Sequence, residues 1–515
     1  MWHIRPNKYK YMKNKLTIIL FFICTIFLLG MSVKGDIGNP IYFQTEKDRV
    51  VGGPFESTNS TSRYALVEAI VENGTVLFNH EQAQFSAPDL VSFDEKLFTI
   101  FTPGVSLVGV PFYILGKQFG LPQLFTYFST VLFAILNVWL IAKVGRILGA
   151  NLCGSLLGGI LFLFGTNALP YAHSFTQHHI STSLILLALL NAVSKRTILN
   201  NILFAYIFSA GLLMDIPNGL MMLPLVLYVL YKQVSVSEKA NKLLVSVKLN
   251  FIALVIGLIP LISFFAWYNY HTSGSMTRFP QSIGRVDYTE EGVVEREGER
   301  GKVDIYDHNS VYDTRNQLNG IYTLLISDER GWFYYSPIIV IGFLGIAAGL
   351  MKKEVETAIP LIISIVSVSI VSYASFGDPW GGWSFGPRYL IPATALVCTG
   401  IGVAIQKYKK NPLFIAIFFV LAVYSVSVNS LGAMTTSAIP PKVEAIHLPD
   451  PIPYTYLYNL EFVEENRSSS LLFNAFIYRF TSFKYYLAAF IAIMTEFILV
   501  LYAYAGISKK REMTS

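Results

Sequence analysis

The segment FGDPWGGWSFGPRYLIP combines residue types that suit the binding of a sugar phosphate. Trp380 and Trp383 offer flat apolar faces on which a sugar ring can stack. Arg388, followed by Tyr389, can hold a phosphate through two parallel hydrogen bonds. The alternative interpretation is an aromatic belt at a membrane surface with a snorkelling arginine. The residue types together favour a site for a sugar phosphate over the belt.

A second group of polar residues lies in PYAHSFTQHHISTSL. It contains His173, Gln177, His178 and His179, and an imidazole can donate to a phosphate oxygen or relay a proton. The alternative is that these side chains cap the start of a helix at the membrane surface. We interpret His178 and His179 as further contacts of the same phosphate.

The third feature is an acidic segment over residues 35–96, after the first apolar run. A carboxylate in a partly dry cavity can act as a general base towards an acceptor hydroxyl, and Asp36 and Glu56 are the candidates. Within this segment, SRYALVEAIVENGT has apolar residues at helical spacing. It predicts an amphipathic helix in the membrane interface, with Arg63 near its start as a donor-binding residue.

Weaker signals lie elsewhere in the chain. Asp215 belongs to the turn sequence Asp-Ile-Pro-Asn-Gly, and Asp328 and Glu329 precede WFYYSP. Such residues are more often caps or turn formers than ligands. The charged segment 285–304 reads as a solvated loop.

Several function classes are excluded by what the sequence lacks. It has no Gly-rich phosphate loop, dinucleotide fingerprint, zinc spacing or Ser/His/Asp order. The cysteines Cys24, Cys153 and Cys398 all fall in apolar runs, which argues against a disulfide framework. We expect no cofactor and no nucleic-acid partner. A divalent metal is not required, although acidic loops can bind one.

The elements that must position these residues are membrane helices. Of the 515 residues, 53% are hydrophobic and only 14% are charged, whereas soluble proteins carry roughly 25% charged residues. Repeated apolar runs are long enough to cross the ~30 Å hydrocarbon core as helices. The sequence predicts an all-α polytopic membrane protein with about twelve spans. They lie near residues 16–34, 122–142, 151–170, 179–194, 200–216, 217–231, 249–269, 335–351, 358–375, 388–406, 412–430 and 483–506.

The basic residues give one consistent orientation. With both termini in the cytoplasm, every short basic cluster between spans falls on the cytoplasmic side. These clusters are Lys143/Arg146, Lys195/Arg196, Lys232 to Lys248, Lys352/Lys353, Lys407/Lys409/Lys410 and Lys509/Lys510/Arg511. The chain is then one integral membrane domain, 1–515. Its outer loops are 35–121, 270–334, 376–387 and 431–482.

The segment Leu97 to Gly116 is long enough to span but is interrupted by Pro103, Gly104 and Pro111. Counting it as a span would place the later basic clusters outside. We therefore predict a re-entrant or interfacial helix on the outer side. The alternative is that it and a neighbouring segment both cross.

Several segments together resemble the GT-C glycosyltransferases, which include protein O-mannosyltransferases and lipid A aminoarabinose transferases. They are SRYALVEAIVENGT with FTPGVSLVGVPFYILG, YAHSFTQHHISTSLILL, GWFYYSP and GGWSFGPRYLIPA. The resemblance implies a GT-C-like fold with juxtamembrane helices and a catalytic carboxylate in the first outer loop. It implies a polyprenyl-phosphate sugar donor and transfer on the outer face.

The sequence departs from the family at one important place. Members often have an Asp-Glu pair just before the Arg-Tyr-Ala step, whereas Ser60 and Thr61 stand here. The base is therefore sought in Asp36 or Glu56. The resulting hypothesis is inverting transfer, within the cell membrane, to a glycan, lipid or protein acceptor.

Two other functions compete with this hypothesis. About twelve spans with both ends inside also suit a transporter or a flippase of a lipid-linked sugar. However, the chain shows no internal repeat, and its ionisable residues gather at the outer membrane level. A polymerase or ligase acting on lipid-linked glycans is the third possibility. Transfer of label from a polyprenyl-phosphate hexose would separate an enzyme from a flippase.

Overall fold

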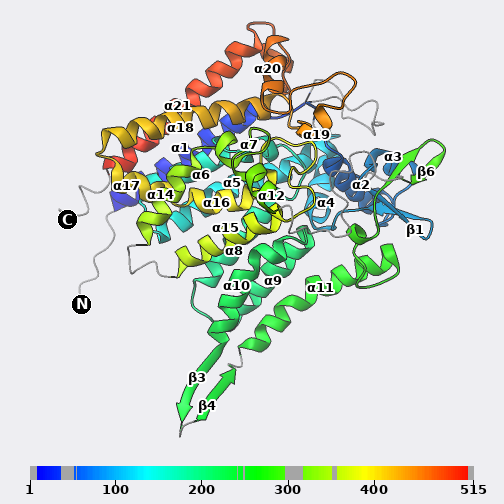
Figure 1. The fold of residues 1–515 in the computed structure, drawn as a ribbon, viewed down its shortest axis with the longest axis horizontal. Coiled ribbons are helices and arrows are strands. Elements are labelled where there is room, and N and C mark those ends of the chain that lie inside the picture. The colour runs from blue at the N-terminus through cyan, green and yellow to red at the C-terminus, as the bar shows by residue number, and fades with distance from the viewer. Residues whose placement is uncertain are drawn as a thin grey trace.

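The structure is a computed structural model, and it describes residues 8–35, 52–53, 55–239, 242–247, 250–295, 317–350 and 357–507. Most helices run along the long axis of the molecule (Figure 1). The start of α1 and the end of α21 lie at one end of this axis. At the opposite end lie α2, α3, β1 and β6, which come from two of the predicted outer loops.

A helix or a broken helix is present at each predicted apolar run. These are α1 (Lys8–Ser32), α5 (Pro122–Ile147), α6 (Leu152–Phe164) with α7 (Ala168–Ala172), α8 (His178–Ala192), α9 (Ile198–Met214), α10 (Asn218–Gln233), α11 (Phe251–Ser273), α14 (Ile339–Gly349), α15 (Ala358–Ala374), η5 (Arg388–Leu390) with α16 (Ile391–Cys398) and α17 (Ile401–Tyr408), α18 (Pro412–Met434) and α21 (Phe483–Ile507).

Helix length separates these elements into two groups. Among the described residues, α5, α11, α18 and α21 are long and apolar enough to cross a membrane alone. The segment from Arg388 through α17 is also apolar but bends by 41° after α16. The other apolar stretches, which include Ile18–Ser32 within α1, have 10 to 17 residues, fewer than the ~20 of a typical span. Several apolar helices fit a membrane protein, and the count of twelve spans stays a prediction.

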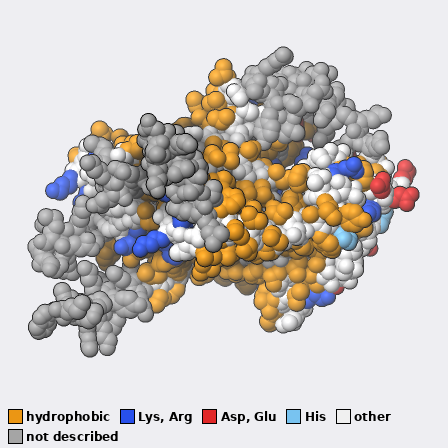
Figure 2. Space-filling model, turned by 90° about the horizontal axis from the view of Figure 1, so that it is seen from below, with side chains coloured by type: hydrophobic (Ala, Val, Ile, Leu, Met, Phe, Trp, Pro, Cys, Tyr) orange, Lys and Arg blue, Asp and Glu red, His pale blue; other side chains and the backbone are white. Residues whose placement is uncertain are grey.

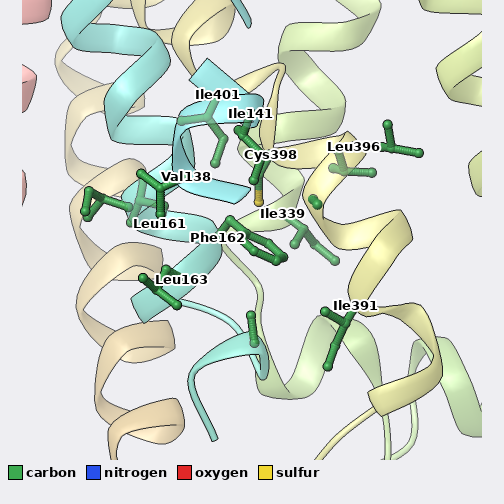
Figure 3. Packing of buried hydrophobic residues seen from close by; sticks show 14 of the residues in the cluster. Val138, Ile141, Leu161, Phe162, Leu163, Ile339, Ile391, Leu396, Cys398 and Ile401 are labelled. Carbon is green, nitrogen blue, oxygen red and sulfur yellow. The ribbon is translucent and has the colours of Figure 1, made fainter. Parts of the chain in front are cut away.

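The helices pack through one large apolar core in which small residues allow close approach. Val138, Phe162, Ile339 and Cys398 from four different helices meet there (Figure 3). At the crossing of α14 with the α16–α17 break, a Cβ added to Gly345 would overlap the carbonyl oxygen of Gly400. Without a hydrophobic force between helices in lipid, such small-residue contacts drive packing.

The segment predicted as the first outer loop folds into a compact subdomain. It contains α2 (Thr58–Glu72), α3 (His80–Ser86), the hairpin β1 (Leu90–Phe93) and β2 (Lys96–Thr99), and α4 (Gly104–Lys117). Helix α2 was expected to lie amphipathically in the interface, but residues 59–67 are all buried. Protein therefore surrounds this half of α2 on every side, because α3, α4 and the β-hairpin pack around it.

The segment predicted as one helix over 97–116 is divided in two. Its first residues belong to β2, and α4 begins only at Gly104. Fourteen helical residues span about 21 Å, less than the hydrocarbon core. Helix α4 packs against α2 and α5, so it completes the outer subdomain.

The chain is mostly helical, but it also contains two small β-sheets among the described residues, which corrects the expectation of an all-α protein. A four-stranded antiparallel sheet has the order β2-β1-β5-β6, with β5 (Val286–Thr289) and β6 (Gly292–Glu295). Leu90 pairs with Val286, which joins the first outer loop to the second. The first part of the predicted solvated loop 285–304 is therefore a hairpin, and residues 296–304 lie outside the described residues. A second hairpin, β3 (Val234–Lys239) with β4 (Lys242–Val247), follows α10.

The remaining outer segments contain short helices. They are η2 (Pro280–Ser282), α12 (Gln317–Leu325), α13 (Trp332–Tyr335), α19 (Lys442–Ala445), α20 (Leu457–Glu464) and η6 (Phe473–Ile477). Around the helices, apolar side chains cover a broad area in the middle of the molecule (Figure 2). Acidic side chains gather at the end where β6 lies. On α11, Ile252, Val255, Ile256, Ile259 and Ile262 are all exposed, as lipid-facing residues are.

Replacing Gly345 with alanine is expected to lower stability. The added methyl group must displace the α14 backbone from Gly400, and such overpacking costs roughly 1–3 kcal/mol. Thermal unfolding of the detergent-solubilised protein measures this loss. Gly30→Ala in α1 is the matched control, because a Cβ there meets nothing within 4 Å. Equal stability of the two variants would contradict this packing.

Candidate functional site

The tryptophan-rich loop 376–387 is fastened to its neighbours by a fully buried arginine. Arg330, 0% exposed, donates to the carbonyl oxygens of Trp380 (3.1 Å), Gly382 (3.2 Å) and Ile439 (2.8 Å). The Ser384 N–H also donates to the Ile439 carbonyl (2.8 Å). Sequence reasoning gave Arg330 no role. It joins this loop to the segment that follows α18, and so shapes one side of the site.

Arg388 lies at the start of α16 and is approached closely by this loop. Gly381 has φ 72°, a left-handed conformation that suits glycine. A Cβ at this position would lie 3.0 Å from the Arg388 Nε. Tyr389 stacks on Tyr373 with a ring separation of 4.5 Å, which holds the backbone next to Arg388.

A small pocket opens beside Arg388. Its lining consists of one cation, two aromatic rings and several hydroxyl groups: Ser57, Tyr171, Ser174, Thr176, Trp383, Arg388, Ser437 and Ala438. Trp383 is 39% exposed and donates from Nε1 to a Glu444 carboxylate oxygen at 2.6 Å. Its indole is therefore held in place at the mouth of the site. Trp380 is not part of this lining, and its carbonyl serves Arg330 instead.

The two predicted histidines have different environments. His179 is enclosed, with Nε2 2.8 Å from the Ala168 carbonyl and Nδ1 3.3 Å from the Asn137 amide nitrogen. Both its nitrogens are used to connect α5, α7 and α8. His178 packs edge-on against Tyr171, and its buried Nε2 has no hydrogen-bond partner among the described residues. His178 is therefore the histidine available to a ligand.

Arg63, from α2, contributes a second cation. It is 1% exposed, its guanidinium lies 3.8 Å from the centre of the Phe101 ring, and it contacts Asn59. Burial lowers its pKa to about 10, opposed by the charges of Asp215 and Asp89. At this pKa the side chain remains a cation at neutral pH. The charge of Arg388 also acts on it, so the two cations share one region.

Several buried polar atoms around these cations have no partner in the described part of the chain. They are Arg63 Nε, Thr176 Oγ1, Gln177 Oε1, His178 Nε2 and Arg388 Nε. Buried polar groups in folded proteins are nearly always paired. Four of these atoms can donate to an oxyanion, and they come from segments far apart in the sequence. The arrangement suits an anionic ligand that completes their hydrogen bonds.

Two carboxylates that the sequence did not single out for the site act electrostatically on Arg63. Asp215, in the turn between α9 and α10, accepts from the Gln177 amide at 3.2 Å. Asp89 accepts from Thr58 at 2.6 Å and pairs with Arg285 at 3.0 Å. Asp215 was interpreted as a turn residue because nothing in a single sequence brings it beside Arg63.

Glu56 has both carboxylate oxygens occupied. Its side chain is 4% exposed and pairs with the Lys34 ammonium at 2.5 Å. It also accepts from the Gly52 N–H, the Thr436 hydroxyl, and both the N–H and hydroxyl of Ser437. Burial disfavours its ionised form, but Lys34 and these hydrogen bonds outweigh that effect and lower its pKa. Asp36, the other predicted base, lies outside the described residues.

Metal ligands do not cluster in the described residues, where no three His, Cys, Asp or Glu side chains could hold an ion together. The arrangement instead offers cations, hydroxyls and carboxylates. It can bind an anion beside a polyhydroxylated ligand and can move a proton.

Comparison with known proteins gives a distant likeness. No family model matches the sequence, and no curated protein matches it. Among solved structures, one that matches is the archaeal oligosaccharyltransferase AglB from Archaeoglobus fulgidus, in complex with an inhibitory peptide and a dolichol-phosphate. The match has 10% identity and a TM-score of 0.38, and covers 93% of this chain. The chain spans 56% of the length of that protein, and a TM-score this low supports no conclusion about activity.

The buried Lys34–Glu56 pair predicts a clear stability effect. Lys34→Met leaves a buried carboxylate uncompensated, which costs about 3–5 kcal/mol. Thermal unfolding in detergent measures the loss. Arg467→Met, which breaks an exposed pair with Glu465, serves as the control and should change little. Equal effects of the two substitutions would contradict a buried ion pair.

The same pair predicts a pH dependence. Because the folded pKa of Glu56 is lowered, its stabilising contribution is complete above the pKa of the unfolded carboxyl. It is lost as the pH falls through the lower folded value. Acid unfolding of wild type and Glu56→Gln should therefore differ by this titration. A wild-type profile identical to that of Glu56→Gln would refute it.

Proposed function

We propose that this chain is a membrane glycosyltransferase that moves a sugar from a polyprenyl-phosphate carrier to a hydroxyl group of a glycan, lipid or protein on the outer face. The observation that carries the proposal is the buried Arg63 together with the half-buried Arg388, each with a buried Nε that has no partner among the described residues, beside a hydroxyl-lined pocket. A phosphate supplies the acceptors that these nitrogens lack.

The charge of the site supports an anionic donor. Asp215 partly compensates the two arginines, while Asp89 is already paired with Arg285. Asp378 also acts on Arg388. A phosphodiester carries one negative charge, which arginine nitrogens can bind through charge-assisted hydrogen bonds. His178 Nε2 is available as a further donor to the same phosphate. When the sugar leaves, the phosphate gains a second negative charge, and the preorganised cations stabilise it in the transition state.

The side chains that line the pocket are of types that bind sugars. Ser57, Ser174, Thr176 and Ser437 offer hydroxyls to sugar hydroxyls, and Trp383 offers an aromatic face. Tyr171 connects the two halves of the site, because its hydroxyl accepts from the Phe385 N–H at 3.0 Å. Trp380, His179 and Tyr389 act behind this lining by holding the backbone and the helix contacts.

We assign Glu56 to positioning. Its oxygens hold Ser437, a residue of the pocket wall, and it directly precedes Ser57 in the same wall. The sequence alone suggests Asp36 as the base of an inverting displacement, whereas the described residues offer another carboxylate in that role. Helix α2, which carries Arg63, lies at the end opposite to the start of α1 and the end of α21 (Figure 1). This arrangement fits a cell-membrane protein with both termini in the cytoplasm.

The proposal is tested with purified protein in liposomes and a radiolabelled polyprenyl-phosphate hexose. Label should pass from the carrier to an acceptor fraction, whereas movement of intact lipid across the bilayer would mean a flippase. Arg388→Ala and Arg63→Ala should each weaken donor binding by at least about tenfold, since hydrogen bonds to charged groups contribute about 1.5–3 kcal/mol.

Arg479→Ala is the matched control, because Arg479 is exposed and its Nε contacts only the neighbouring Tyr478 hydroxyl in the described structure. It should bind and transfer as wild type does. Unchanged donor affinity in both Arg63→Ala and Arg388→Ala would overturn the phosphate site.

A further inference from the structure

We propose that Asp215 is the general base that accepts the proton of the acceptor hydroxyl. The inference rests on the proposed function. It starts from the position of the carboxylate, which lies in the turn between α9 and α10 and within electrostatic range of both Arg63 and Arg388. Asp215 is therefore in the same region as the group that leaves.

The hydrogen bonds of Asp215 leave one oxygen available. Within the described parts of the chain, Gln177 is its hydrogen-bond donor, through Oδ2. No ion pair with a described cation is formed within 4 Å. A base needs an orienting partner on one side and an open acceptor on the other, and Asp215 has this arrangement.

Gln177 is well placed to act as the orienting partner. It directly precedes His178 at the start of α8 and is buried, with its Oε1 unpartnered. The turn itself is fixed from the other side by Asn218, whose amide donates to Ser181 at 2.8 Å and to the Gly211 carbonyl at 2.9 Å. The carboxylate is thus held by rigid helix ends, which favours a defined geometry for proton transfer.

The other buried carboxylates at this end of the molecule are engaged elsewhere. Glu56 accepts from five groups, and Asp89 is bound by Thr58 and Arg285. Glu329 accepts from the Lys442 N–H at 2.6 Å and lies next to Arg330. Glu68 has an unpartnered oxygen, but the charges that act on it are those of Glu72 and Glu81. Asp215 alone among these five carboxylates combines a free oxygen with the arginine pair.

Burial supports the same role. It raises the pKa of Asp215, against the opposing effects of Arg63, the Gln177 hydrogen bond and Arg388. A carboxylate with a raised pKa is a stronger base than an exposed aspartate. Burial and the charges of Arg388 and Arg63 lower the pKa of the neighbouring His178. His178 therefore does not take this proton in place of Asp215.

In the proposed reaction, the new glycosidic bond forms as the acceptor proton and the carrier phosphate leave. The acceptor oxygen forms a bond to the anomeric carbon while its proton passes to Asp215. The bond from the anomeric carbon to the phosphate oxygen breaks, and its electron pair stays on the phosphate. The polyprenyl phosphate leaves with its second negative charge beside Arg63 and Arg388. Asp215 later returns the proton to water.

Asp215→Asn tests the assignment in the same liposome assay. It should lower the transfer rate by about 10²–10⁴-fold without weakening donor binding, because the arginines remain and lose only a compensating negative charge. Asp94→Asn is the matched control. Asp94 is exposed in the turn between β1 and β2 at φ 47°, a conformation that asparagine also adopts. This control should transfer at the wild-type rate.

Two further measurements distinguish a base from a residue that only positions the arginines. The wild-type rate should rise with pH along a limb set by Asp215, and this limb should be absent from the residual rate of Asp215→Asn. Formate, a small external carboxylate, should partly restore transfer in Asp215→Ala. Weaker donor binding in Asp215→Asn without a slower bound-state rate would overturn the assignment, as would failure of formate rescue in a folded variant.

The outcomes keep the two proposals apart. If the wild-type protein transfers no sugar from any polyprenyl-phosphate donor, the proposed function fails. If wild type transfers sugar and Asp215→Asn transfers it equally fast, only the base assignment fails. Should Asp215→Asn not fold, Asp215→Glu keeps the test decisive, since a base predicts a retained rate with a shifted pH limb. An unshifted limb would refute the assignment.

Discussion

The arrangement of the candidate site depends on two arginine charges, one buried at Arg63 and one half-buried at Arg388. A guanidinium in a protein interior is costly unless partners surround it. Arg63 has an aromatic ring, a carbonyl and a nearby carboxylate, and Arg388 lies between two tyrosines and the glycine loop. Neither arginine is fully satisfied. The Nε atoms without partners show that the site lacks a hydrogen-bond acceptor. The surrounding segments hold the two side chains in place.

The segments that hold the arginines are connected by polar contacts rather than by the apolar core. Arg330 fixes the tryptophan loop through main-chain acceptors, and Glu56 fixes the segment after α18 through main-chain and hydroxyl donors. Each contact is buried, so its loss leaves several groups unpaired at once. The apolar core positions the helices, while these polar contacts decide how the outer loops close over the site.

How much of this could be foreseen from sequence differs between the core and the site. Hydropathy located a helix at every apolar run, because each backbone segment in lipid must satisfy its own hydrogen bonds. The types of Arg388 and Trp383 also indicated their chemistry. The buried setting of α2 was missed, since a helix covered on all sides by protein looks amphipathic when only its apolar spacing is read. The β1–β2 hairpin was missed because Leu97 to Thr99 belong to the same apolar run as α4, which begins at Gly104.

Partner choice could not be read from the sequence at all. Glu56 looked like a free carboxylate in an acidic loop, yet its donors come from Lys34 and from residues 436 and 437. Asp215 looked like an ordinary turn residue, yet it lies beside Gln177 and the arginines. Pairing across such distances depends on the tertiary fold, which a single sequence does not reveal.

The contact between Glu56 and Ser437 also has a consequence for synthesis of the protein. These residues are 381 positions apart in the chain, and the ribosome must make nearly the whole polypeptide before they can meet. The helices near the N-terminus are made long before the wall that contains Ser437. A nascent chain is therefore unable to form the complete pocket until nearly all of the protein has been made.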